Sequence, residues 1–111
     1  MKWEIIYYNQ RVKDLIDKMP VGIRASYTRI TERMIFQGPD LKMPLTRAMG
    51  QGLFEIRAKG QEGTARVFYC AEVRNQIVIL HGFIKKTNKT PKKELDLAKK
   101  RMKEVMKHEF I

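Results

Sequence analysis

Two arginines, Arg57 and Arg66, have the side chains and spacing best suited to chemistry. They flank the segment Gly60-Gln61-Glu62-Gly63, and if this four-residue loop closes a regular hairpin, the two arginines face each other across it. Facing like charges destabilise a sheet by roughly 0.2 to 1 kcal/mol, so we expect an anion between them. A phosphate suits this position, because the planar fork of arginine holds two oxygens and stays protonated.

The elements that would position these arginines are three extended runs, residues 53–59, 64–74 and 76–86. Each run is rich in β-branched and aromatic residues and is bounded by turn residues, which predicts a meander of strands. Side chains alternate between the faces of a strand, so the runs can be sorted by face. The first predicted face carries Glu55, Arg57, Lys59, Arg66, Phe68, His81, Phe83 and Lys85. The second carries Phe54, Ile56, Ala58, Val67, Tyr69, Ala71, Val73, Val78, Leu80 and Ile84.

The two predicted faces differ in character. The second is apolar and is expected to face a core. The first is a cationic surface with interleaved aromatic rings, which suits the phosphates and stacked bases of single-stranded nucleic acid.

Helical patterns come before and after the meander. Residues 2–8 have strand composition, and Asn9 can cap a helix that Pro20 ends. A second helix is predicted over 22–37, where Gly38-Pro39 stops it, and Thr90-Pro91 begins a last helix over 91–108. Residues 40–52 are expected to form a loop, from which Lys42 and Arg47 either reach a polyanion or remain solvated. The prediction is one α+β domain over 1–111: an antiparallel meander of about four strands, a helical hairpin on one face and a C-terminal helix.

Composition points to a polyanionic partner. The chain has 111 residues and a formal net charge of +11, from 23 basic and 12 acidic residues. Such a charge predicts nucleic acid, a ribosome or an acidic protein as partner, although a solubilising surface is the alternative. The single cysteine, Cys70, has no partner for an internal disulfide, and no apolar stretch approaches the roughly 20 residues that span a bilayer. We therefore expect a cytoplasmic protein.

Several classes of enzyme are excluded by missing motifs. The sequence has no Cys-x-x-Cys or His-Glu-x-x-His pattern and no phosphate-binding glycine loop, and its one serine, Ser26, has no plausible histidine partner. What remains is a cluster of arginines and lysines. Such a cluster can catalyse cleavage of RNA, because the 2′-hydroxyl next to the scissile phosphate is the nucleophile and the protein only orients, moves protons and stabilises charge.

The motifs resemble those of a known toxin family. Gly52-Leu53-Phe54-Glu55-Ile56-Arg57, then Arg66-Val67-Phe68-Tyr69, then Leu80-His81-Gly82-Phe83-Ile84-Lys85-Lys86-Thr87, Thr90-Pro91 and Ala98-x-x-Arg101 are similar to the HigB and phage Gp49-like branch of the RelE/ParE superfamily. The resemblance implies a RelE-like fold and the toxin of a type II toxin–antitoxin pair. It further implies an mRNA endonuclease that acts in the ribosomal A site without a metal or other cofactor and is neutralised by a helix-turn-helix, HigA-like antitoxin.

The resemblance also implies roles for individual residues. Arg57 and Arg66 match the family's strand arginines that contact the scissile phosphate, and Lys85 and Lys86 match the basic positions after the last strand. These four are the candidate catalytic residues. The candidate RNA-binding residues are Lys59, Phe68, His81, Phe83, Lys89, Lys92 and Lys93.

This sequence departs from the family at the proton donor. Many relatives have a tyrosine or histidine near the C-terminus, where this chain has Lys92-Lys93-Glu94-Leu95-Asp96, and His108 lies too far along. The general acid is therefore unassigned, and proton transfer by a lysine is the working hypothesis. Two other functions stay open: a ParE-like poison of DNA gyrase, and a non-catalytic protein that binds RNA or the ribosome.

Overall fold

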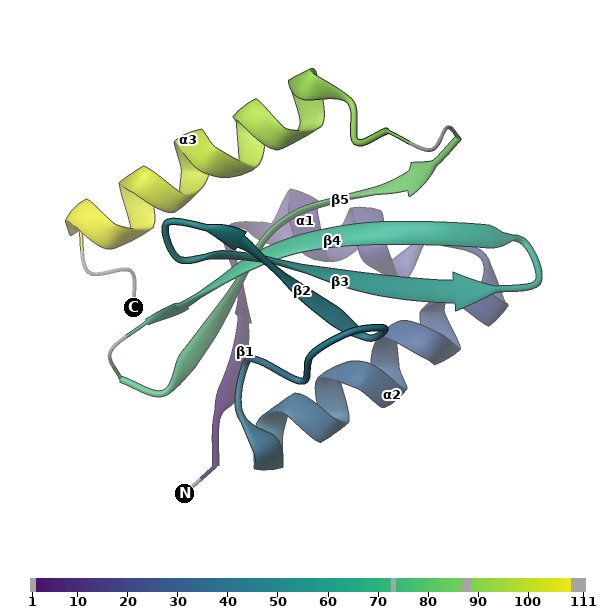
Figure 1. Ribbon diagram of the computed structural model, residues 1–111, viewed down its shortest axis with the longest axis horizontal. Coiled ribbons are helices and arrows are strands. Elements are labelled where there is room, and N and C mark those ends of the chain that lie inside the picture. The colour runs from purple at the N-terminus through teal and green to yellow at the C-terminus, as the bar shows by residue number, and fades with distance from the viewer. Residues whose placement is uncertain (1, 73, 87–88, 109–111) are drawn as a thin grey trace.

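The computed structural model describes residues 2–72, 74–86 and 89–108, which form one sheet with helices on both faces (Figure 1). The elements follow in the order β1 (Glu4–Tyr7), α1 (Gln10–Asp17), α2 (Val21–Gln37), β2 (Thr46–Gly50), β3 (Leu53–Gly60), β4 (Gly63–Glu72), β5 (Gln76–Lys85) and α3 (Lys92–His108). The predicted α+β class is confirmed.

The sheet is mixed rather than purely antiparallel. Its five strands lie in the order β1-β5-β4-β3-β2, and β1 runs parallel to β5, from Glu4 opposite Gln76 to Tyr7 opposite Ile79. Parallel neighbours need a long crossover, which the chain between β1 and β5 supplies. The predicted meander of about four strands is therefore right for β3, β4 and β5 and wrong for the sheet as a whole.

The segment predicted as a loop, residues 40–52, contains the strand β2. β2 pairs antiparallel with β3, with Thr46 opposite Ile56 and Arg47 opposite Glu55. The loop prediction was wrong because Thr46 is the only β-branched residue of this strand, so its own composition gives little strand signal. Pairing with β3 supplies its hydrogen bonds.

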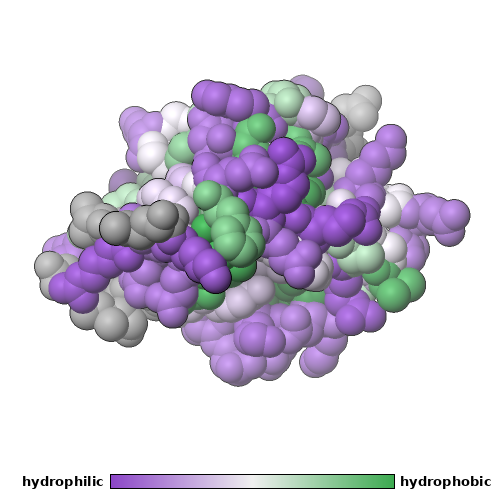
Figure 2. Space-filling view, turned by 90° about the horizontal axis from the view of Figure 1, so that it is seen from below, coloured by the Kyte–Doolittle hydropathy of each residue, from purple (hydrophilic) through white to green (hydrophobic). Residues whose placement is uncertain are grey.

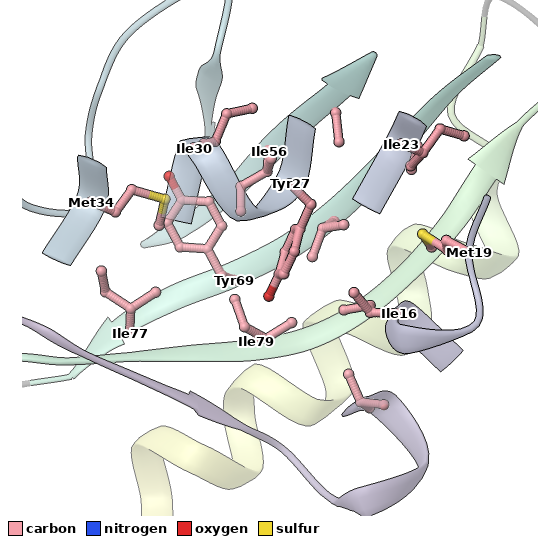
Figure 3. Packing of buried hydrophobic residues seen from close by; sticks show 14 residues of the cluster. Ile16, Met19, Ile23, Tyr27, Ile30, Met34, Ile56, Tyr69, Ile77 and Ile79 are labelled. Carbon is pink, nitrogen blue, oxygen red and sulfur yellow. The ribbon is translucent and has the colours of Figure 1, made fainter. Parts of the chain in front are cut away.

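The first core lies between the sheet and the helices α1 and α2, as predicted. The side chain of Asn9 accepts a hydrogen bond from the backbone N–H of Val12 at 3.0 Å and so caps α1, while Gly38 (φ 96°) ends α2. Figure 3 shows the packing of helix residues against the strands. The labelled residues are Ile16 of α1, Met19 of the turn between the helices, Ile23, Tyr27, Ile30 and Met34 of α2, and Ile56, Tyr69, Ile77 and Ile79 of the sheet.

The tip of the β3–β4 hairpin packs on the start of α2. Pro20, at the N-cap position, offers no side-chain cap, and Glu62 Oε2 instead accepts a hydrogen bond from the backbone N–H of Gly22 at 2.9 Å. This bond is the main cause that lowers the pKa of the Glu62 carboxyl. A Cβ on Gly60 would lie 2.6 Å from Gly22 C and Ile23 N, so only glycine permits this approach.

A second core lies on the opposite face, beneath α3. It contains Leu53, Phe68, Cys70, Val78, Leu80, Ala98, Met102 and Val105. Val78 and Leu80 were predicted on the other face. That prediction was wrong because of an irregularity in the β4–β5 ladder: Phe68 is opposite His81 while Tyr69 is opposite Ile79, so the alternation changes phase at Leu80. Val73, also assigned to the apolar face, lies outside the described residues.

The surface seen in Figure 2 is largely hydrophilic, with small hydrophobic patches between the polar side chains. Exposed large apolar residues include Val21 and Phe36 of α2. Across residues 2–72, 74–86 and 89–108, no helix has the length and apolar character needed to cross a membrane.

Candidate functional site

The candidate site lies on the α3 side of the sheet, and the strand register arranges its residues in cross-strand rows. Antiparallel pairing aligns β3, β4 and β5, so each row takes one residue from each strand. From the α3-covered end to the hairpin tip, the rows are Leu53–Cys70–Val78, then Glu55–Phe68–His81, then Arg57–Arg66–Phe83, then Lys59–Thr64–Lys85. The character of the face thus changes from apolar to cationic along the strands.

The facing arginines are present as predicted. Arg57 of β3 is directly opposite Arg66 of β4, and the register up to Gly60 opposite Gly63 is regular. Arg66 is buried, with 5% of its surface exposed, whereas Arg57 is half-buried. The two guanidinium groups are therefore in different environments, although they occupy equivalent positions on their strands.

The protein itself supplies one negative charge next to the arginine pair, the carboxylate of Glu55. Glu55 has no exposed surface, and its Oε1 accepts a hydrogen bond from Arg66 Nη1 at 2.6 Å. The same oxygen lies 3.3 Å from Arg47 Nη2 of the neighbouring strand β2. One carboxylate thus lies between two arginines, and among the described residues neither of the ion pairs formed by Glu55 involves Arg57.

Three polar atoms of this cluster are buried without a hydrogen-bond partner among the described residues: Glu55 Oε2, Arg57 Nε and Arg66 Nε. Such groups are rare in native proteins, because each costs roughly 1 to 3 kcal/mol when left unpaired. The acceptors of the described residues therefore do not saturate the donors of the two facing arginines.

Lys85, in the last row, belongs to the same cluster. Partial burial lowers the pKa of its ammonium group below the ordinary lysine value, and the charges of Arg66 and Arg57 lower it further. Glu55 acts in the opposite direction, with a smaller effect. Lys85 is therefore a lysine whose proton is easier to remove than usual, placed beside two arginines.

Arg57 and Lys59 also line a hollow of about 270 Å³ at the edge of the sheet, together with Thr64, Ser26, Pro44 and Leu45. The hollow lies beside the start of β2, where the chain turns into that strand. It gives Arg57 access to a ligand that the more deeply buried Arg66 lacks.

The three candidate ring residues are placed differently from one another. Phe68 has no exposed surface and is part of the α3 core, so in this fold it cannot stack on a base. Its predicted base-stacking role is therefore not available. His81 is 8% exposed, and its Nε2 lies 2.8 Å from Glu94 Oε1. Phe83 is half-buried, with its ring centroid 6.0 Å from that of Phe68 and 6.3 Å from that of His81.

The remaining candidate lysines are Lys86, Lys89, Lys92 and Lys93, and all four are exposed. Lys86 is exposed and lines an open cleft of about 480 Å³ with His81, Phe83 and Glu94. Lys89, Lys92 and Lys93 are exposed on the connector and the start of α3, and Lys92 is paired with Asp96 at 2.8 Å. Thr87, which is part of the family motif, lies outside the described residues. These lysines fit an extended contact with a polyanion better than a catalytic role.

Arg47 is a member of the cluster that sequence reasoning placed in a loop. The signal that could have identified it is Gly50-Gln51-Gly52, which separates two short runs as the loop of a hairpin does. Pairing β2 with β3 through that turn brings Arg47 opposite Glu55. The described residues include no group of three or more His, Cys, Asp or Glu side chains that could hold a metal ion.

A comparison with models of protein families shows to which family the chain belongs. A search of curated proteins finds no match. The model of the phage-derived Gp49-like proteins (DUF891) matches residues 14–103, which include the arginine pair, Glu55 and Lys85. The match covers most of the sequence, and this chain belongs to the phage-derived Gp49-like protein family.

Proposed function

We propose that this chain is the toxin of a type II toxin–antitoxin system and that it cleaves mRNA in the ribosomal A site. Membership of the Gp49-like family suggests a toxin-like role. The observation that carries the proposed activity is the facing pair Arg57 and Arg66 beside Lys85, on an end of the sheet that α3 leaves uncovered. The RelE-like and HigB-like motifs of the sequence support the same activity.

The proposed reaction uses a nucleophile that belongs to the substrate. The 2′-hydroxyl of RNA gives up its proton to water and attacks the adjacent phosphorus in line. The bond to the 5′-oxygen breaks, that oxygen takes up a proton, and a 2′,3′-cyclic phosphate forms. Negative charge builds up on the phosphorane oxygens during this step. Arg57, which is half-buried and pairs with no carboxylate among the described residues, would bind those oxygens, with Arg66 behind it. Preorganised donors of this kind act most strongly where water is partly excluded.

Lys85 is the proposed proton-transfer residue. Its lowered pKa brings the ammonium closer to the range in which it exchanges protons with a substrate oxygen. In the protonated form it would donate a proton to the departing 5′-oxygen. This assignment fills the role that a tyrosine or histidine has in many relatives.

The partners of the proposed toxin follow from its charge. A net charge of +11 suits a ribosome with its mRNA, and an antitoxin of helix-turn-helix type would inactivate the protein by covering the cationic end of the sheet. A small helix-turn-helix gene directly beside the toxin gene would support this part of the proposal.

The test is 5′-end mapping of a defined mRNA in a reconstituted translation reaction, with and without ribosomes. Wild type should give cuts that require ribosomes. Arg57→Ala should reduce the cleavage rate by about 10²- to 10³-fold, as the loss of one preorganised donor does. Arg57 is a better target than Arg66, because Arg66 pairs with a buried carboxylate and its loss also affects folding. The charge-matched control is Arg33→Ala, on the exposed surface of α2, which should cut like wild type.

Two results would overturn the proposed activity. An uncut message with protein bound to ribosomes or RNA would leave a binding protein, and DNA damage without mRNA cleavage would indicate a gyrase poison. Equal cleavage by Arg57→Ala and Arg33→Ala would place the chemistry elsewhere on the chain.

A further inference from the structure

We infer that Glu55 is a positioning residue that holds Arg66 and Arg47 in place and thereby leaves Arg57 as the arginine that first binds the RNA phosphate. The inference deepens the proposed function and rests on it. It concerns a buried acidic residue inside a cationic site, which the chemistry of RNA cleavage does not itself require.

The contacts of Glu55 are specific. Its Oε1 lies 2.6 Å from Arg66 Nη1 and 3.3 Å from Arg47 Nη2, so one oxygen serves arginines on both neighbouring strands. Arg47 is directly opposite Glu55 in the β2–β3 ladder, and Arg66 is one row further along β4. The carboxylate is thus fixed by the sheet, and it fixes two long side chains in turn.

Burial excludes a direct contact between Glu55 and the substrate. Glu55 has no exposed surface, and Arg66 has 5%. The side chain of Arg47 is 44% exposed and that of Arg57 is half-buried, so these two arginines lie nearer to the ligand. Glu55 therefore acts through the arginines, and it is not a proton acceptor for the 2′-hydroxyl in this arrangement.

The charges of the cluster divide the arginines into two kinds. Glu55 offsets part of the positive charge of Arg66 and Arg47, whereas Arg57 has no carboxylate partner among the described residues. A phosphate entering the site would thus gain most from Arg57, and Arg66 would be presented in one fixed orientation behind it.

The first experiment measures the order of the Arg66 guanidinium by NMR of its Nε–H group. In wild type the group should be rigid on the picosecond to nanosecond timescale. Glu55→Asp keeps the charge but shortens the side chain by one methylene, so Arg66 should become mobile. A rigid Arg66 in folded Glu55→Asp would overturn the inference. This measurement needs neither RNA nor activity, so its failure is distinct from failure of the proposed function.

The second experiment measures how the affinity for a short single-stranded RNA depends on salt. Glu55→Gln removes the buried charge, so it should bind more tightly and the slope of log K against log salt should steepen by about 0.7, the value for one further phosphate contact. The control Glu4→Gln makes the same change in net charge at β1, on the far edge of the sheet, and should leave the slope unchanged. Equal slopes for the two variants would overturn the division of the arginines.

The third experiment measures cleavage on programmed ribosomes. Glu55→Gln should cut at least tenfold more slowly at saturation while binding at least as tightly as wild type. A purely structural carboxylate would instead lower the active fraction and leave the affinity of the remaining protein unchanged. Glu55→Asp decides the matter if Glu55→Gln does not fold: it should keep the affinity of wild type and lose rate, and a wild-type rate would overturn the inference.

Discussion

The two ends of the α3-side face are built on the same three strands, yet they differ in almost every physical property. At one end Leu53, Cys70 and Val78 are buried beneath α3; at the other, Lys59, Thr64 and Lys85 are partly or fully exposed. In Figure 1, α3 lies over the part of the sheet away from the β3–β4 hairpin tip. The candidate site is at the boundary between these ends, where arginines are partly desolvated and still reachable.

This boundary position has an electrostatic consequence. A charge interaction is stronger where water is partly excluded, and the arginine rows lie next to a fully apolar core. The charged rows of the site thus continue the apolar rows of the core on the same strands. The ion pair with Glu55 makes the burial of Arg66 possible. The comparison predicts that substitutions of buried residues at the boundary, such as Arg66, affect stability and activity together, while those of more exposed residues affect activity alone.

The largest effect is expected for Arg66→Ala. Removing Arg66 leaves the buried Glu55 with only the partly exposed Arg47 as a charge partner, and should reduce the free energy of unfolding by about 3–5 kcal/mol. The double variant Glu55→Leu/Arg66→Leu should recover much of this loss, because a buried pair can be replaced by apolar residues at little cost. Urea unfolding of both variants measures these changes in the free energy of unfolding. A loss below about 1 kcal/mol in Arg66→Ala would show that the boundary is more hydrated than its burial indicates.

A smaller effect is expected at the covered end. Val105→Ala on α3 removes two buried methyl groups at about 0.8 kcal/mol each, so thermal or urea unfolding should show a loss of about 1–2 kcal/mol. Met106→Ala is the control on the same helix, because Met106 is 51% exposed, and it should change stability by less than about 0.5 kcal/mol. Equal losses would mean that α3 does not cover the sheet as described.

The smallest effect is a shift in the titration of Lys85. Its pKa is lowered by partial burial and by Arg66 and Arg57, so Arg57→Ala should raise it toward the ordinary value, while Arg33→Ala should not. Because the folded-state pKa lies below the unfolded one, protonated Lys85 opposes folding at pH values below the folded pKa. This opposition is relieved as the pH rises toward the ordinary lysine value. NMR titration of the Lys85 side chain measures its pKa in each variant. A lower pKa in Arg57→Ala than in wild type would contradict the prediction.

The parts of the fold and of the site that could be predicted from the sequence are those that depend on local signals. The loop from Gly60 to Gly63 sets the register of its hairpin, so the pairing of Arg57 with Arg66 followed directly. Asn9, Pro20 and Gly38 mark helix ends by their own chemistry. The cationic row of Lys59 and Lys85 likewise needed only the alternation of side chains.

The parts that could not be predicted depend on contacts distant in sequence. β2 is a strand because β3 lies beside it, and the irregularity at Leu80 has no local signature. The last helix was predicted from its start at Thr90-Pro91, but the sequence does not show that this helix covers Phe68. The buried pairing of Glu55 with Arg47 follows from β2 and so was missed together with it.

The contact between Glu62 and the start of α2 affects the order of folding. The two residues that make this cap are 40 positions apart in the chain, and α2 has no side-chain cap at its own N-cap position. The first turn of α2 can therefore become fully ordered only after the β3–β4 hairpin has closed and reached it. The helix and the hairpin that carries the arginines should therefore consolidate together, and not as separately formed units.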